Sequence, residues 1–166
     1  MRFELHQDFA AHAPADVAAA YADPGLYGAM VDLPFVGTPT TLRHGLDGAI
    51  TEVSVRYAVQ VELPSAARVF VDPSRLTFVE HVRLAADGNG TFHVEPDHYD
   101  RLLRFAGTYR VGAGVHGGTR RSVAGDLRVD LGWKGRLVEA DVTRVIANGL
   151  RDALHAQVAV VERYLG

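Results

Sequence analysis

The C-terminal part of the chain carries an amphipathic pattern long enough to cover a whole sheet. From about Leu137 to Leu165, apolar residues return at steps of three and four positions, with charged residues between them. This spacing predicts one helix of about seven turns. The preceding sequence mostly alternates with a period of two, which is typical of strands. A sheet with one apolar face needs a cover, and only this helix is long enough.

Gly149 lies on or beside the apolar stripe of that helix. Inside a helix a glycine costs about 1 kcal/mol relative to alanine. It indicates either that a neighbour needs the space or that the cost is simply tolerated. Gly149 is therefore a candidate residue of a ligand pocket.

The N-terminal sequence predicts a strand followed by two short helices. In residues 2–11, Phe3, Leu5 and Phe9 share one face, on which Gln7 is the polar exception. An alanine-rich helix follows, and residues 23–25, Asp-Pro-Gly, end it. A second helix is expected over about residues 25–32, before Pro34.

A hairpin is predicted around Asp47-Gly48, a pair that suits a two-residue turn. This turn places Arg43 opposite Glu52 and His44 opposite Thr51. His44 then lies on the apolar face, where it is either a satisfied core or rim residue or a group that orients a ligand. The same face includes Val53, Val55, Tyr57, Val59 and Val61.

Two further hairpins complete a sheet of six to seven strands. In the last one, Leu103, Phe105 and Tyr109 are expected to point inward, as are Val123 and Leu127. Residues 74–85 pair with residues 91–98 in one of two registers. One register places Glu80 opposite Glu95, and the other, with a bulge, pairs Val82 with Val94. We expect the second, because like charges opposite each other are unfavourable.

The segment "FHVEPDH", residues 92–98, places two histidines and two carboxylates close together. On a strand, His93 and Glu95 would project to the same side, about 7 Å apart. A metal would need a third ligand from a neighbouring strand, and Pro96 disturbs the pairing needed to bring in His98. The alternation instead favours a strand with Phe92 inward and its polar side in water. We therefore expect no metal site and no cofactor.

Glu80 shares a strand face with large apolar residues. Either it points inward, where a carboxylate is usually paired or protonated, or it is exposed at a bulge or sheet edge. An inward Glu80 could bind a ligand hydroxyl or act as a base, so Glu80 and His44 are the candidate catalytic residues. Trp133, at the entry to the long helix, either lines a pocket mouth or wedges the junction. Gln7, Tyr57 and Tyr109 complete the candidate pocket.

Composition limits the classes of partner and location. The chain has 166 residues, 48% of them hydrophobic and 22% charged, which predicts one soluble domain over residues 1–166 with a real core. A net charge of −3 argues against nucleic acid as a partner. The only basic pair, Arg120-Arg121, is expected in a glycine-rich turn. The sequence contains no cysteine, and no leader or membrane-spanning segment is expected, so we predict a cytoplasmic location. A homodimer is left open.

The order of elements, the opening "FELHQDFAAHAPADVAAAYADPGLY" and the closing "WKGRLVEADVTRVIANGLRDALHAQVAVVERYL" resemble the START-related, polyketide-cyclase-like helix-grip superfamily. The resemblance spans essentially the whole chain, and more narrowly it is to a bacterial branch of unknown function. It implies an α+β fold in which a curved antiparallel sheet wraps around the long C-terminal helix. The superfamily includes lipid carriers, receptors, cyclases and chaperone activators, so the fold alone leaves the function open.

Three functions follow as hypotheses. The first is binding or transport of a hydrophobic small molecule, such as a lipid, isoprenoid or polyketide, between the sheet and the helix. The second is a cofactor-independent cyclase or dehydratase that uses a cavity acid or base. The third is a protein-interaction module with a filled core, which predicts no cavity above about 300 Å³. Whether the chain is an enzyme is left open.

Overall fold

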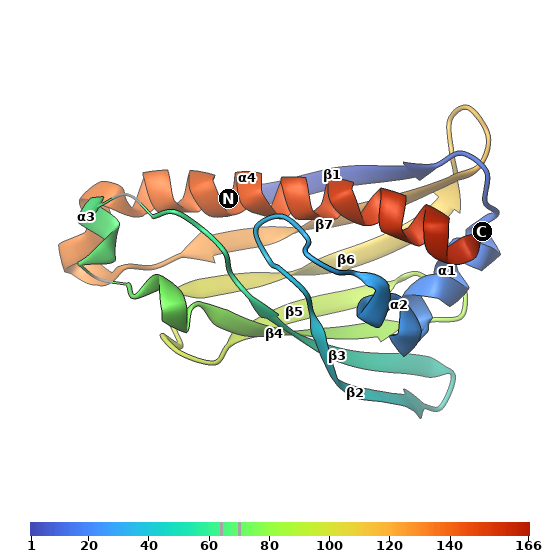
Figure 1. Ribbon diagram of the computed structural model, residues 1–166, viewed down its shortest axis with the longest axis horizontal. Helices are drawn as coiled ribbons and strands as arrows, with labels where there is room; N and C mark the ends of the chain where they lie inside the picture. The colour runs from blue at the N-terminus through green and yellow to red at the C-terminus, as the bar shows by residue number, and fades with distance from the viewer. Residues whose placement is uncertain (64, 70) are drawn as a thin grey trace.

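Seven strands form one curved antiparallel sheet, in the order β1-β7-β6-β5-β4-β3-β2. The computed structural model describes residues 1–63, 65–69 and 71–166. Figure 1 shows the sheet with one long helix lying along it. The strands are β1 (Arg2–Phe9), β2 (Thr40–Asp47), β3 (Ile50–Ala58), β4 (Thr77–Leu84), β5 (Gly90–Pro96), β6 (Leu103–Ala113) and β7 (Thr119–Val129).

The long helix is α4 (Gly132–Leu165), whose 34 residues correspond to a length of about 50 Å. It begins five residues before the start of the periodic pattern, at Gly132 rather than at about Leu137. Two short helices, α1 (Pro14–Ala22) and α2 (Pro24–Ala29), follow β1 and lie near the C-terminal end of α4 (Figure 1). A four-residue helix, α3 (Ser65–Arg68), and a 3₁₀ turn at Pro73–Arg75 lie between β3 and β4. The predicted helix-grip architecture is confirmed.

The core lies between the inner face of the sheet and α4. Strand β1 shows how the sequence produces it, because exposed and buried residues alternate along its whole length. Phe3 packs edge to face against Phe105 of β6, with 5.4 Å between ring centroids. From the helix side, Val142 and Val161 are buried against this layer. The two apolar patterns of the sequence therefore meet in one core.

The predicted register of the first hairpin is wrong by two residues. Asp47 pairs with Ile50, so the turn residues are Gly48 and Ala49, and His44 lies opposite Val53. Gly48 has a positive φ of 61°, which glycine adopts without strain. The shift is even, so His44 stays on the inner side of the strand. However, β2 is the last strand of the sheet and His44 is exposed.

The β4–β5 register also differs from both alternatives. Val82 pairs with Phe92 and Glu80 with Val94. Inward residues face inward residues, as in the expected bulged register, and the two carboxylates are not opposite each other. The difference comes from the turn, where Ala85 N donates to Asn89 O at 2.8 Å and continues the hairpin further than expected.

Arg121 was expected in a turn but lies inside the sheet. Strand β7 begins at Thr119, so Arg121 pairs with Gln7 of β1 and Val111 of β6. It has the same parity as Val123 and Leu127 and therefore points inward. This correction places a cation in the interior.

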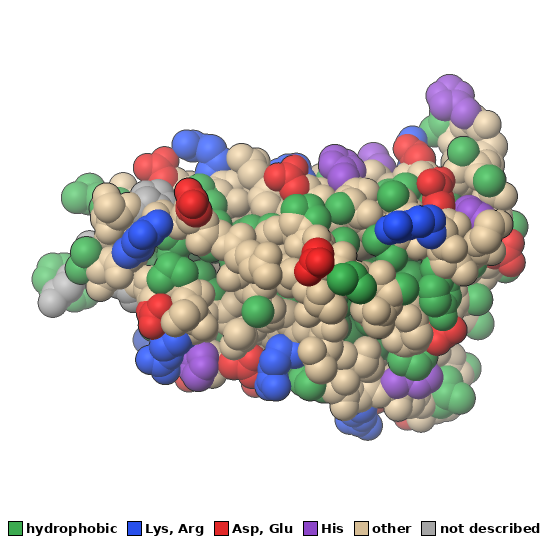
Figure 2. All heavy atoms as spheres, viewed as in Figure 1, with side chains coloured by type: hydrophobic (Ala, Val, Ile, Leu, Met, Phe, Trp, Pro, Cys, Tyr) green, Lys and Arg blue, Asp and Glu red, His purple; other side chains and the backbone are tan. Residues whose placement is uncertain are grey.

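The viewed face carries charges of both signs, scattered over the surface without a continuous basic stripe (Figure 2). Among the described residues, no helix combines the length and apolar character needed to cross a membrane.

Gly149 gives room to an aromatic ring. A Cβ at this position would overlap the ring of Phe35, which belongs to the loop before β2 and has a positive φ of 70°. The expected close neighbour of this mid-helix glycine is therefore a side chain of the fold.

We predict that Gly149→Ala lowers the free energy of unfolding, although alanine favours a helix by about 1 kcal/mol. The reason is the overlap of the new methyl group with Phe35. Chemical denaturation measures the effect. Gly28→Ala is the matched control, because a Cβ at Gly28 of α2 meets no atom within 4 Å. Equal effects of the two substitutions would contradict the prediction.

Candidate functional site

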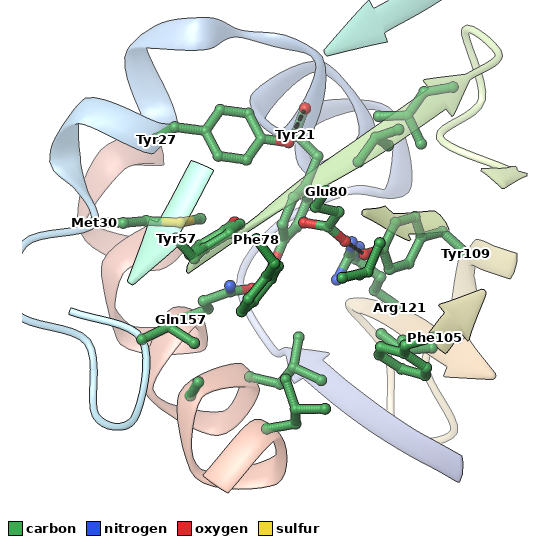
Figure 3. Close-up of a pocket in the computed structure, with 18 of the residues that line it drawn as sticks. Tyr21, Tyr27, Met30, Tyr57, Phe78, Glu80, Phe105, Tyr109, Arg121 and Gln157 are labelled. Atoms are coloured by element: carbon green, nitrogen blue, oxygen red, sulfur yellow. Dashed lines mark hydrogen bonds between the residues drawn. The ribbon is translucent and has the colours of Figure 1, made fainter. Parts of the chain in front are cut away.

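A cavity lies between the sheet and α4, closed at one end by α1 and α2 (Figure 3). It leaves about 60 Å³ for the centres of water-sized molecules. By this measure one water needs about 10–15 Å³, so the cavity has room for a few waters. Most of its wall is apolar: Met30, Val36, Phe78, Val82, Leu84, Val94, Leu103, Phe105, Val123, Leu150, Ala153 and Leu154.

A compact polar cluster interrupts this apolar wall. Glu80 comes from β4, Tyr109 from β6 and Arg121 from β7, and all three point into the cavity (Figure 3). The Tyr109 hydroxyl donates a short hydrogen bond to Glu80 Oε1. We call these three residues, together with Tyr21, the polar cluster.

Arg121 is held between two aromatic rings. Its Cζ lies 3.8 Å from the ring centroid of Tyr21 and 3.9 Å from that of Tyr109, both within the range of cation–π contacts. Such contacts are strongest where water is excluded, and Arg121 is only 4% exposed. The tyrosines therefore fix the orientation of a buried cation inside an apolar cavity.

Gln7 holds Arg121 in place by a hydrogen bond and does not itself line the cavity. Its Oε1 accepts from Arg121 Nη1 at 2.6 Å and from the Tyr21 hydroxyl at 3.3 Å. Its Nε2 donates to the backbone oxygen of Leu154 on α4. The polar exception on the apolar face of β1 thus connects the sheet, α1 and the long helix.

The cavity environment changes the acidity of Glu80. Burial raises the pKa of its carboxyl, and this effect outweighs the opposing influences of the Tyr109 hydrogen bond and the Arg121 charge. Burial and the nearby Glu80 likewise raise the pKa of Tyr57 and Tyr109, so both phenols stay protonated. The cluster therefore offers neutral hydroxyl donors, a fixed cation and a carboxyl group that holds its proton more tightly than usual.

The other predicted pocket residues lie in different places. Tyr57 lines the cavity beside Phe78, with 5.3 Å between the stacked rings. His44, on the edge strand β2, does not line it, and its Nε2 lies 2.9 Å from the backbone oxygen of Ala22 at the end of α1. Trp133, in the first turn of α4, is 78% exposed and is not a lining residue, and Gly149 faces Phe35 instead. Of the two candidate catalytic residues, Glu80 therefore lines the cavity and His44 does not.

Sequence reasoning missed Arg121, Tyr21 and Gln157 as cavity residues. The parity of Arg121 with Val123 was the available signal, but it depended on where the strand begins. Gln157 lies on α4 among apolar positions.

The polar side of β5 faces outward, as the alternation predicts. His93 and Glu95 are exposed, and His93 stacks on His81 of β4 at 4.8 Å between ring centroids. His81 also contacts Ser54 Oγ at 3.0 Å and Glu95 Oε2 at 3.3 Å. Among the described residues, no group of three or more histidines, cysteines or carboxylates has an arrangement that could hold a metal ion.

We predict that Glu80 makes the protein less stable as the pH rises. The folded state keeps the Glu80 proton at pH values at which the unfolded chain, with a pKa near 4.5, has lost it. The stability of the wild type should therefore fall relative to Glu80→Gln between that value and the raised folded pKa, and the difference should be constant above it. Denaturant unfolding at several pH values measures this difference.

Glu62→Gln is the control for this measurement, because Glu62 is an exposed carboxylate outside the cavity. It should show no change of this kind. A wild type that gains stability relative to Glu80→Gln as the pH rises would contradict the prediction.

No family model matches the sequence, and no curated protein matches it. Solved structures do match. The structure of TTHA0849 from Thermus thermophilus aligns with a TM-score of 0.70 at 13% identity, over 99% of both chains. The Zhui aromatase/cyclase from a Streptomyces species aligns with a TM-score of 0.65 at 14% identity, over 100% of this chain and 96% of that one.

A third similar structure is StfQ, a di-domain aromatase/cyclase from the steffimycin biosynthetic pathway. It aligns with a TM-score of 0.57 at 13% identity, over 99% of this chain and 49% of StfQ. At such identities the likeness concerns the fold. The chain has the helix-grip fold of these proteins, and the resemblance predicted from its element order is confirmed at that level.

Proposed function

We propose that the protein binds a hydrophobic small molecule in the cavity between the sheet and α4. The observation that carries this proposal is a polar cluster inside an otherwise apolar cavity. Ligand sites typically combine apolar walls with a few convergent polar groups that fix orientation. Affinity would come from buried apolar surface, at about 25 cal/mol per Å².

The polar cluster is costly for a merely structural core. Removing a guanidinium and a carboxyl group from water disfavours folding, and well-packed apolar residues of similar size are often at least as stable. Ionisable groups with perturbed pKa values in a cavity are characteristic of functional sites. Arg121 and Glu80 therefore support a ligand site more than a filled core.

The size of the cavity imposes a condition on this proposal. About 60 Å³ lies well below the ~300 Å³ typical of small ligand pockets, and by volume alone it favours the interaction module with a filled core. A ligand must therefore displace lining side chains. The Tyr57–Phe78 pair and Met30 line the cavity, and methionine repacks easily. We propose that the cavity widens as the ligand enters.

An enzyme that transfers protons is the second candidate, and the Glu80–Tyr109 hydrogen bond favours it. A buried carboxyl group with a raised pKa is suited to general acid–base work. Arg121 could stabilise negative charge that develops on a substrate oxygen. Two similar structures belong to aromatase/cyclases, which supports chemistry of this general kind.

We predict that Ala153→Leu abolishes binding of the uncharged dye N-phenylnaphthylamine. Ala153 lines the cavity from α4, so a larger side chain would occupy the space into which the ligand must enter. Dye fluorescence, which rises in apolar surroundings, measures binding to the wild type as a saturable signal.

Ala159→Leu is the matched control, because Ala159 lies on the exposed side of the same helix. It should bind the dye like the wild type. Binding that is unchanged in Ala153→Leu, or no saturable binding by the wild type, would rule out this cavity as the site.

The enzyme candidate predicts that the protein accelerates exchange of the α-hydrogens of tetralone in heavy water. The Glu80 carboxylate would take a proton from the carbon beside the carbonyl and return a deuteron, while Arg121 donates to the carbonyl oxygen. Nuclear magnetic resonance follows the exchange, which should fall to background in Glu80→Gln although that variant still binds the dye. Equal exchange by the wild type and Glu80→Gln would leave binding as the function.

A further inference from the structure

The charges of the polar cluster constrain the ligand that the proposed site accepts. We infer that the cavity takes an apolar molecule whose polar end is an uncharged hydroxyl, as in a phenol or an alcohol, and discriminates against carboxylates and amines. This inference rests on the proposed function and adds the chemical class of the ligand. It is argued from the arrangement of Glu80, Tyr109 and Arg121.

The cluster presents one carboxyl group, on Glu80, and one guanidinium, on Arg121, to the same small space. Tyr109 connects them, because its hydroxyl donates to Glu80 and its ring lies against the Arg121 guanidinium. Glu80 and Arg121 both line the cavity. When Glu80 is ionised, its negative charge balances the positive charge of Arg121 before any ligand enters.

The site has both donors and acceptors left for hydrogen bonds to a ligand. A guanidinium has five N–H donors and no acceptor, and Gln7 accepts from Nη1 of Arg121. An ionised carboxylate has about four acceptor positions, and on Glu80 the hydroxyls of Tyr109 and Tyr57 occupy two of them. A ligand hydroxyl can donate to Glu80 and accept from Arg121 at once. A carboxylate can only accept and an ammonium can only donate, so each satisfies one of the two.

A charged ligand would also meet a like charge in a site with little water. A carboxylate bound to Arg121 would lie close to Glu80, and an ammonium bound to Glu80 would lie close to Arg121. Repulsion between such charges is much stronger in a buried site than in bulk water. The raised pKa of Glu80 shows that this cavity already disfavours one negative charge.

The cavity wall indicates a molecule with one polar end. Along β4, Phe78 follows Glu80 on the same face toward the start of the strand, and along β6, Phe105 and Leu103 follow Tyr109 in the same way. On the opposite wall, Leu150 lies two turns of α4 before Gln157. The polar cluster is therefore one patch in a largely apolar wall, and the apolar body of the ligand would extend from it toward the start of β6.

The test compares three molecules that differ only in the polar end. Naphthol, naphthoate and naphthylmethylamine compete with N-phenylnaphthylamine for the wild-type protein at about pH 7, where the first is neutral, the second an anion and the third a cation. We expect naphthol to displace the dye at a concentration at least about tenfold lower than either charged analogue.

The same competition measured on Glu80→Gln gives a second test. Removing the acid leaves Arg121 without a nearby carboxylate, so naphthoate should gain on naphthol by about tenfold or more. Glu62→Gln, which changes an exposed carboxylate, should keep the wild-type order. If Glu80→Gln fails to fold, the wild-type comparison decides by itself.

The outcomes separate this inference from the proposed function. If naphthoate or the amine displaces the dye from the wild type as well as naphthol does, the inference is overturned while the binding function stands. If the dye does not bind and none of the three molecules shifts the melting temperature, the binding function itself fails.

Discussion

The packing of α4 across the concave face of the sheet is the contact on which the rest of the structure depends. Neither surface is stable alone, because each exposes an apolar stripe that only the other can cover. The cavity exists because this contact is incomplete. Phe3 and Val161 are fully buried in the contact, whereas around Ala153 and Leu150 a gap remains.

The polar cluster is organised by that same contact. Gln7 donates to the backbone of α4 and accepts from Arg121, so the position of the helix and the orientation of the cation are coupled. Tyr21 completes the support from α1. A movement of α4 that widens the cavity would therefore also disturb the support of Arg121. Under the proposed function, ligand entry would therefore change the polarity of the site as well.

The outer face of the sheet carries a second set of polar groups with a different character. His81 contacts Ser54 on one side and Glu95 on the other. A serine, a histidine and a carboxylate in this order also form the catalytic triad of many hydrolases. These groups lie on an open strand surface, and the cavity lies on the opposite face. Reactivity depends on enclosure and on stabilisation of developing charge, which the cavity side offers. The polar side chains of the "FHVEPDH" segment therefore lie on the outer surface of the sheet, away from the cavity.

The sequence by itself determined the order of elements, the long helix and the inward faces of the strands, because periodicity is a local property that follows from backbone geometry. It also placed Gln7, Tyr57 and Tyr109 on the inner side. Only the tertiary structure decided which inward groups meet. Arg121 joined the cavity because β7 begins at Thr119, and His44 left it because β2 is an edge strand. Strand ends and sheet order depend on contacts between distant segments, and these leave no periodic signal in the chain.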